Sequence, residues 1–330
     1  MKPKKESTSE SFCKASELWM ESVGPRLKES SIVKYRNIID VHLLPYFKEM
    51  DMSDINSTDI LAFCNSLLQP DEKNESGLAS KTISDILTVL KSIYRFISEK
   101  NSFENVIRDW PSVGQTHRPL RILSLPEQHK LSLYLYKHLT PCNLGILLCL
   151  YTGIRIGKIC ALKWMDISVE EKIIQIRKTM QRIQCRNTEP PKTTILISSP
   201  KSSCSIRSIP IPDELSCMIV KYRKSDDSFF LTGKENYFIE PRTLQNRFKA
   251  ITAACGISDA NFHSLRHTFA TRCVELGFDL KSLSEILGHA NVNITLNRYV
   301  HPSLEQKRRN MNLLSVYLTA DKLAERDGNG

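Results

Sequence analysis

The sequence lacks the features that would place the chain in a membrane or in an oxidising compartment. Its longest apolar run, Leu144 to Tyr151, is shorter than the roughly 18 residues of a membrane-spanning helix. The first ten residues, MKPKKESTSE, contain lysines, but no apolar stretch follows them. A secretory signal would have such a stretch. Ten cysteines are present, yet none forms a C-x-x-C pair. These absences predict a cytoplasmic protein in which Cys149, Cys160 and Cys273 are buried free thiols.

Common motifs for nucleotide and metal chemistry are also missing. The sequence has no Walker A loop, no H-E-x-x-H segment and no carboxylate cluster for two metal ions. His263 and His267 do have the i, i+4 spacing of zinc ligands. Arg266 between them would place a fixed cation beside the metal, so we do not expect a metal site here.

Basic charge is the main compositional signal. The 330 residues carry a formal net charge of +10, and apolar and charged fractions of 41% and 25% are ordinary for a globular protein. Residues 171–210 hold eight Lys or Arg against two Asp or Glu. A basic surface favours polyanions because binding releases counterions, which makes nucleic acid a candidate partner.

Apolar periodicity predicts a mainly α-helical protein with a small β-sheet or hairpin. After a polar tail at 1–10, residues 11–107 are expected to form a compact helical domain. Its helices are expected from Ser11 to Gly24, from Ser31 to Tyr46, from Thr58 to Gln69 and from Ser80 onward. Residues 108–123, with two prolines and no periodicity, are expected to link this domain to the next.

The second domain is predicted to span 124–302, with a further helix at 303–323 inside a C-terminal segment of 303–330 that could contact a neighbouring molecule. Its first helix begins at the capping sequence Ser124-Leu125-Pro126-Glu127. Alternating apolar residues predict short strands at 172–176, 194–197 and 205–210.

Five segments of this second domain could act on a phosphate. His263 and Arg266 lie at i, i+3, so imidazole and guanidinium can reach one ligand. Alone, this pair would more often be a surface pair, and a tyrosine near a helix end is usually packing. The five segments are T-G-I-R-I-G around Arg155, the hairpin P-K-S-S-C-S-I-R-S-I-P containing Lys201, H-S-L-R-H-T-F-A-T, L-G-H ending at His289, and the terminal Tyr299.

In this order and spacing, the segments resemble the catalytic domain of the tyrosine recombinases, the phage and transposon integrases. The resemblance covers about 122–302, and the helical first domain is similar, more loosely, to the core-binding domain of that family. It implies a DNA-binding α-helical domain followed by an α+β catalytic domain. It also implies site-specific recombination through a 3′-phosphotyrosine, which integrates or excises a mobile element without metal or ATP.

The resemblance also implies a role for each matching residue. Arg155 and Arg266 would clamp the scissile phosphate, and Lys201 would protonate the departing 5′-oxygen, with Lys192 as the fallback. His263 would move protons at the tyrosine, and His289 would donate a hydrogen bond to the phosphate. Tyr299 would attack phosphorus. Further basic residues are expected to contact the DNA: Arg118, Arg121, Lys178, Arg182, Lys192 and Arg207.

One position departs from the family pattern. The family usually has an acidic residue three positions after the first arginine, where this chain has Lys158. A cation beside Arg155 would attract phosphate but leave the arginine poorly oriented. The sequence therefore predicts that Lys158 lowers strand cleavage without abolishing it.

Two other functions stay open at this point. A type IB topoisomerase has a similar pocket but reseals its own strand, and a DNA-binding homologue could have kept the fold with impaired catalysis. The expected partners are double-stranded recombination sites, on which four copies assemble, and an accessory directionality factor. Free in solution, the chain is expected to be a monomer without membrane contact.

Overall fold

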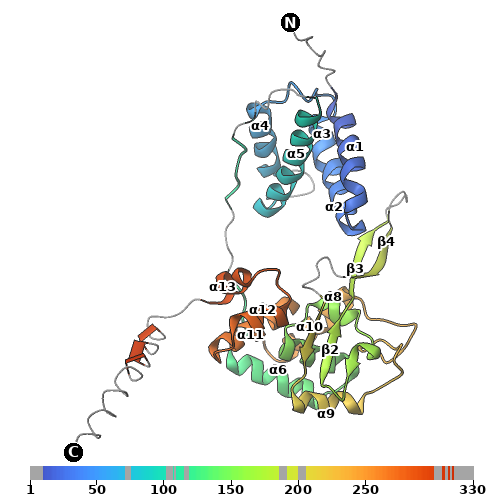
Figure 1. Ribbon diagram of the computed structural model, residues 1–330, viewed down its shortest axis with the longest axis vertical. Helices are drawn as coiled ribbons and strands as arrows, with labels where there is room; N and C mark the ends of the chain where they lie inside the picture. Colours follow the sequence, from blue (N-terminus) through green and yellow to red (C-terminus); the bar gives the residue numbers. More distant parts are fainter. Residues whose placement is uncertain are drawn as a thin grey trace, which may run out of the picture. The chain divides into compact units, whose positions relative to one another are not determined.

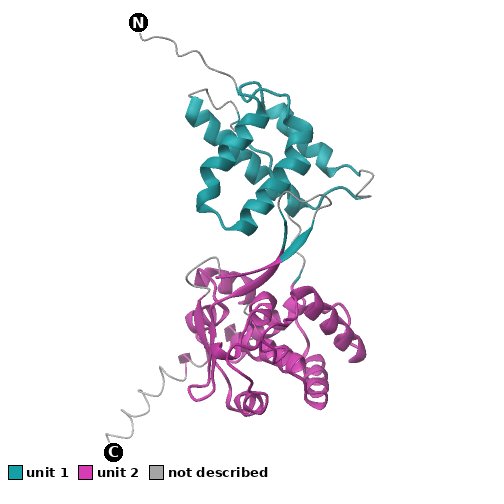
Figure 2. Ribbon diagram, turned by 90° about the vertical axis from the view of Figure 1, so that its right-hand side faces the viewer, with its two compact units in different colours: residues 1–119, 183–194 teal, residues 120–182, 195–330 magenta. Residues whose placement is uncertain are grey.

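The computed structural model divides the chain into two compact units, which are coloured separately in Figure 2. Unit 1 comprises residues 1–119 and 183–194, and unit 2 comprises 120–182 and 195–330. The division at 119/120 falls inside the stretch that the sequence predicts as a linker. The structure describes residues 10–70, 76–101, 107, 109–114, 119–185, 192–199, 206–300, 307–308, 311–312 and 314–315. None of the helices in these ranges is long and apolar enough to cross a membrane.

Unit 1 is built from helices around one apolar core. The helices are α1 (Phe12–Val23), α2 (Glu29–Ile38), α3 (Leu44–Phe47), α4 (Ser57–Leu68) and α5 (Ser80–Asn101). The longest, α5, buries the predicted stripe that includes Ile83, Ile86, Leu90 and Ile97. Burial of this stripe against α1 stabilises the unit, because apolar area leaves water on one face of each helix.

The helix predicted from Ser31 to Tyr46 is confirmed as an unbroken helical stretch from Glu29 to Phe47, with a change of helix type just before Pro45. The structure has α2, then a π-helical turn at Ile39–Leu43, then α3. Pro45 lacks an N–H, so the regular i to i−4 ladder cannot continue across it. The π-helical turn widens the helix just before this proline, a common way to absorb such a break.

Unit 2 combines eight helices of the described chain with short strands (Figure 1). The helices are α6 (Leu125–Lys137), α7 (Pro141–Thr152), α8 (Ile156–Cys160), α9 (Asp213–Lys221), α10 (Pro241–Ala254), α11 (Phe262–Glu275), α12 (Leu280–Leu287) and α13 (Val292–Tyr299). Helix α7 is buried on all sides, as its continuous apolar sequence predicts. Helices α11, α12 and α13 pack against one another and carry most of the residues singled out above.

The strands form two small antiparallel groups. Strands β1 (Ile167–Ser168), β2 (Ile173–Ile176) and β5 (Arg207–Pro210) make a sheet of order β1-β2-β5, in which Ile174 lies opposite Ile209. Strands β3 (Thr179–Gln184) and β4 (Thr193–Ser198) form a separate pair. The predicted strands near 172–176, 194–197 and 205–210 are confirmed. Strand β3 was not predicted, because Met180 and Ile183, its buried apolar residues, do not alternate.

Further predictions from the sequence concern the cysteines and the two ends of the chain. Cys149, Cys160 and Cys273 are buried free thiols, as predicted. In the predicted helix at 303–323, positions 307, 308, 311, 312, 314 and 315 are helical and exposed. The rest of that helix and the tail at 1–9 lie outside the described residues.

Candidate active site

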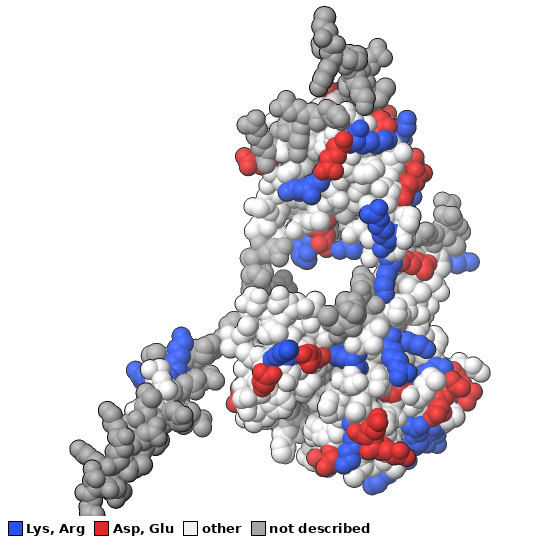
Figure 3. Space-filling view, viewed as in Figure 1, with Lys and Arg blue, Asp and Glu red and all other residues white. Residues whose placement is uncertain are grey.

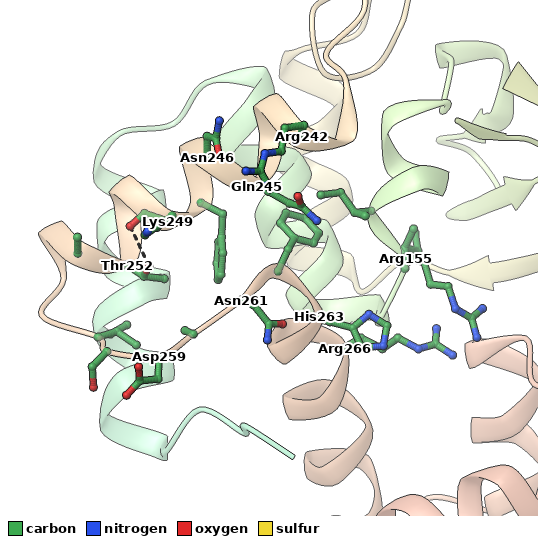
Figure 4. A pocket seen from close by; sticks show the side chains of 18 residues that line it. Arg155, Arg242, Gln245, Asn246, Lys249, Thr252, Asp259, Asn261, His263 and Arg266 are labelled. Atoms are coloured by element: carbon green, nitrogen blue, oxygen red, sulfur yellow. Dashed lines mark hydrogen bonds between the residues drawn. The ribbon is translucent and has the colours of Figure 1, made fainter. Parts of the chain in front are cut away.

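Helix α11 positions three side chains that could act on a phosphate. Its start is fixed by a capping box: Asn261 accepts the N–H of Ser264 at 3.1 Å, and the Ser264 hydroxyl accepts the N–H of Asn261 at 3.2 Å. From this fixed start, helical spacing brings His263 beside Arg266, with the Arg155 side chain close by (Figure 4). His267 follows one residue after Arg266, and its side chain is buried.

Arg266 is held rigidly in the interior of unit 2. Its guanidinium donates to the carbonyl oxygens of Gly153 at 2.8 Å and Leu287 at 2.9 Å, and it lies 2.8 Å from Nε2 of His289. Only 2% of the residue is exposed. Burial and the charge of Arg155 lower the pKa of Arg266 to about 9, so it remains a cation at neutral pH. A cation fixed in this way is preorganised to bind an anion.

The two glycines on either side of Arg155 are required for different structural reasons. Gly153 ends α7 in the left-handed conformation with φ of 63°. A Cβ on Gly157 would lie 2.6 Å from the carbonyl oxygen of Met180, so only glycine allows α8 to approach β3 this closely. Between them, Arg155 precedes the first turn of α8 and points a guanidinium nitrogen at the Leu287 carbonyl, 3.5 Å away.

His289 and Tyr299 enter the same site from α12 and α13. Gly288 ends α12 with φ of 66°, which turns the chain so that His289 faces Arg266. Tyr299 is the last residue of α13 and is 6% exposed. Its hydroxyl lies 3.0 Å from Nδ1 of His267, and its ring is parallel to that of His289 at a centroid distance of 6.4 Å. The phenol of this chain therefore lies in the chain's own cationic site.

The histidines of the site are neutral at physiological pH. Desolvation, followed by the nearby arginines, lowers the pKa of His263, which is still exposed at its helix start, to about 4 and that of the buried His289 to about 3. Burial and His263 lower the pKa of His267 to about 4. Burial raises the pKa of Tyr299, which keeps the phenol protonated. Neutral imidazoles beside a protonated phenol can accept its proton.

Four cationic side chains lie close to one another in this site. They are Arg155, Arg266, Lys158 and Arg207. Lys158 is 5% exposed, and Arg207 donates from Nε to the Ile286 carbonyl. Burial and then the three guanidinium groups lower the pKa of Lys158 to about 7. Burial and Arg155 lower the pKa of Arg207 to about 10. The depressed pKa values of all four residues indicate a site whose excess positive charge an anion would relieve.

A cavity of about 660 Å³ opens beside Arg155, His263 and Arg266. Figure 4 shows α10 along its other wall, where the polar side chains are those of Arg242, Gln245, Asn246, Lys249 and Thr252. Their spacing along α10 places them on one helical face. The cavity thus connects the buried cations to a polar surface.

The other predicted DNA contacts fall in different environments. Arg121 donates to Glu127 at 3.0 Å and to the Ser258 carbonyl at 3.0 Å, and Arg182 donates to Glu240 at 3.1 Å. Lys178 and Lys192 are exposed. Arg118 and Lys201 lie outside the described residues. Acidic and basic side chains are interspersed over the face of unit 2 seen in Figure 3, in keeping with such ion pairs.

Sequence reasoning missed three parts of this site. Arg207 was expected as an ordinary DNA contact, yet it belongs to the buried cluster. His267 was considered only as a zinc ligand, although its spacing from His263 could have indicated a shared pocket. Thr295, whose hydroxyl lies 2.8 Å from Nδ1 of His289, carried no signal that distinguished it from other helix threonines.

Comparison with known proteins agrees with this geometry. Residues 120–306 match the phage integrase family, and residues 11–68 match the N-terminal SAM-like domain of phage integrases. A tyrosine recombinase XerC-like protein of Caldanaerobacter subterraneus subsp. tengcongensis is 27% identical over 319 residues, covering 88% of this chain and 78% of that protein. The ICEBs1 integrase of Bacillus subtilis is 23% identical, covering 90% and 80%.

Solved structures share the fold. The Tn1549 transposon integrase in complex with a circular intermediate DNA matches with a TM-score of 0.70 at 21% identity, covering 90% of this chain and 98% of that one. A lambda integrase tetramer bound to a Holliday junction matches with a TM-score of 0.62 at 17% identity, covering 89% and 78%. The chain therefore belongs to the phage integrase family of tyrosine recombinases, enzymes of site-specific DNA recombination.

Proposed function

We propose that this chain cuts and rejoins DNA at a specific site through a covalent bond between Tyr299 and a 3′-phosphate. The observation that carries the proposal is the burial of the Tyr299 hydroxyl beside Arg266 and the neutral His267. In the forward step the phenol oxygen attacks phosphorus and the bond from phosphorus to the 5′-oxygen breaks. A 5′-hydroxyl from another strand reverses the step and releases the tyrosine.

The cationic cluster would stabilise the transition state of this step. Negative charge grows on the non-bridging oxygens as the phenol attacks, and guanidinium forks match those oxygens. Arg155 and Arg266 line the cavity and would take this position. Lys201 would protonate the departing 5′-oxygen, as the family resemblance implies. These residues supply the charge neutralisation that a metal ion provides in other phosphoryl transfers.

The proton of Tyr299 needs an acceptor, and two candidates are His267, which contacts the phenol, and His263, whose ring contacts that of His267. His263 lines the open cavity, whereas His267 is buried and holds the phenol hydroxyl at 3.0 Å in the free protein. We assign proton transfer during attack to His263, because it lies where the phosphate enters and can exchange protons with water. His267 would position the phenol before attack.

Glutamine substitutions separate these two roles. We expect His263→Gln to slow covalent adduct formation about 10²-fold, the usual contribution of a general base. His267→Gln should slow it no more than about tenfold, because the amide can still hydrogen-bond to the phenol. Adduct formation is measured on a nicked suicide substrate. A larger loss in His267→Gln would move the proton acceptor to His267.

Lys158 would limit the rate of this chain. A buried ammonium next to Arg155 and Arg266 adds repulsion that a carboxylate would replace with attraction and orientation. We expect Lys158→Glu to speed adduct formation up to about tenfold, the lower range for residues that orient a site. Lys158→Met, which removes the charge without adding a carboxylate, should give a smaller gain. Unchanged rates in Lys158→Glu would exclude this role.

The proposed partner is double-stranded DNA. The exposed polar face of α10 and the basic residues Lys178 and Lys192 would contact the duplex, mainly at phosphates. Because exchange between two sites cuts four strands, we propose four copies on the DNA and a monomer when free, as well as an accessory directionality factor. The protein would work in the bacterial cytoplasm on the nucleoid.

A strand-transfer assay tests the proposed function. Sequencing of excised junctions first identifies the recombination site, and two labelled duplexes carrying it are then mixed with the protein in excess EDTA. Joining of one duplex to the other supports recombination without metal. Resealing within each duplex alone would indicate a topoisomerase, and the absence of any covalent adduct would indicate a DNA-binding homologue without cleavage activity.

A further inference from the structure

The ring nitrogens of His289 have two different partners. Nε2 lies 2.8 Å from Nη2 of Arg266, and Nδ1 lies 2.8 Å from Oγ1 of Thr295. A guanidinium has only N–H donors, so Nε2 must accept and can carry no proton. A neutral His289 therefore carries its proton on Nδ1 and donates it to the Thr295 hydroxyl.

The surroundings exclude an imidazolium at this position. Thr295 is fully buried, His289 is 9% exposed, and the charges facing the ring are the cations Arg266, Arg155, Arg298 and Arg207. The Tyr299 ring lies parallel to the imidazole and is a protonated, uncharged phenol, so it does not offset these charges. A second proton on the ring would be both desolvated and repelled. His289 must therefore act in one of its two neutral tautomers.

The tautomer of the free protein cannot perform the role that the family resemblance implies for His289. A hydrogen bond from Nε2 to the scissile phosphate requires a proton on Nε2, where the free protein has none. A scissile phosphodiester has only acceptor oxygens, so as the partner of Nε2 it would need a donor at that nitrogen. The change of tautomer then releases the Nδ1 proton to solvent and takes up one proton from solvent at Nε2, with no net change in charge.

We propose that Thr295 is a positioning residue that lets His289 exchange tautomers when phosphate binds. In the free protein Oγ1 accepts from Nδ1–H. In the bound state the hydroxyl rotates and donates to Nδ1, while Nε2–H donates to the phosphate. A hydroxyl can serve both states because it is donor and acceptor at once, which neither a backbone carbonyl nor a carboxylate can be. This inference rests on the proposed function, since it presumes a phosphate beside His289.

Ring ¹⁵N spectra of the full chain labelled at histidine test the exchange directly. Inorganic phosphate serves as the probe, with chloride at matched ionic strength as control, and His289→Gln assigns the signals. We expect the Nδ1–H tautomer without phosphate at every pH from 5 to 9, and the Nε2–H tautomer with phosphate. The same tautomer in both states would overturn the proposal. These spectra need no DNA cleavage, so they are independent of the proposed function.

Substitutions at Thr295 connect the tautomer to activity. Thr295→Val removes the hydroxyl at constant shape and should lower the maximal rate of adduct formation about 10- to 100-fold with little change in DNA affinity. Thr295→Ser should restore most of the rate. Thr268→Val is the matched control, because its buried hydroxyl accepts from the Leu123 N–H at 2.9 Å. It should lower thermal stability but leave the His289 tautomers unchanged.

The outcomes separate the two proposals. An adduct in wild type together with equal rates in Thr295→Val and wild type would overturn the role of Thr295 and leave the proposed function intact. A phosphate-dependent tautomer change without any adduct on the recombination site would support the inference and contradict strand cleavage.

Discussion

Tyr299→Phe is expected to abolish the covalent adduct between protein and DNA. The phenol oxygen is the only atom lost, and without it no 3′-phosphotyrosine can form, so we expect strand cleavage to fall by about 10⁴-fold or more. DNA binding should persist, because a phenyl ring keeps the packing of Tyr299 against Ala270, Leu283 and Leu287. The measurement is the shift of labelled DNA into a protein-linked band on a denaturing gel.

A second tyrosine provides the control for this experiment. Tyr136 also has a hydrogen-bonded hydroxyl, 2.9 Å from that of Tyr151, but it lies outside the cationic site. Tyr136→Phe should therefore keep the adduct at the wild-type level. An adduct of undiminished yield in Tyr299→Phe would show that another residue is the nucleophile and would refute the mechanism.

Arg266→Lys is expected to slow strand cleavage about 10²- to 10³-fold, the usual loss when one preorganised donor to a transition-state oxyanion is removed. Lysine keeps the positive charge but cannot reproduce the fork that now reaches Gly153 and Leu287 and meets His289. Its ammonium could bond to these acceptors or to phosphate, but not to both with the same geometry. Single-turnover rates of adduct formation measure the loss.

Arg272 is the matched control on the same helix. Its guanidinium donates to the Leu123 carbonyl at 2.8 Å and pairs with Glu275, so its contacts are structural. Arg272→Lys should reduce thermal stability slightly and leave the cleavage rate within a few-fold of wild type. Equal rates for Arg266→Lys and wild type would mean that position 266 contributes charge alone, and the proposed clamp would be wrong.

The position of Lys158 affects the balance of charge in the site. In place of the acidic residue of the family pattern, this chain buries Lys158 among three guanidinium groups, and a pKa of about 7 leaves it half-protonated near neutrality. The site is therefore electrostatically strained without its anion, and entry of a phosphate would relieve repulsion as well as form new hydrogen bonds. We therefore expect Lys158 to strengthen phosphate binding and to leave Arg155 less well oriented.

The sequence by itself predicted which residues would carry the chemistry, and it determined much of the local structure. Apolar stripes and caps are short-range signals, so α5, α6 and α7 could be predicted from spacing alone. The same holds for His263 and Arg266, because helical spacing places them on one face. The order of the motifs around Arg155, His289 and Tyr299 was sufficient to indicate a phosphotyrosine mechanism.

Only the tertiary structure decided the contacts among these residues. Arg207, His267 and Thr295 come from β5, α11 and α13, and their roles depend on distances between elements that no local pattern encodes. Burial is likewise a property of the packed chain, and it is burial that makes Lys158 half-protonated near neutrality and keeps His289 neutral. Periodicity is a property of one helix or strand, whereas desolvation and the interaction of charges depend on how several elements pack together. For this reason the type of chemistry could be predicted from the sequence, but the protonation states of the site residues could not.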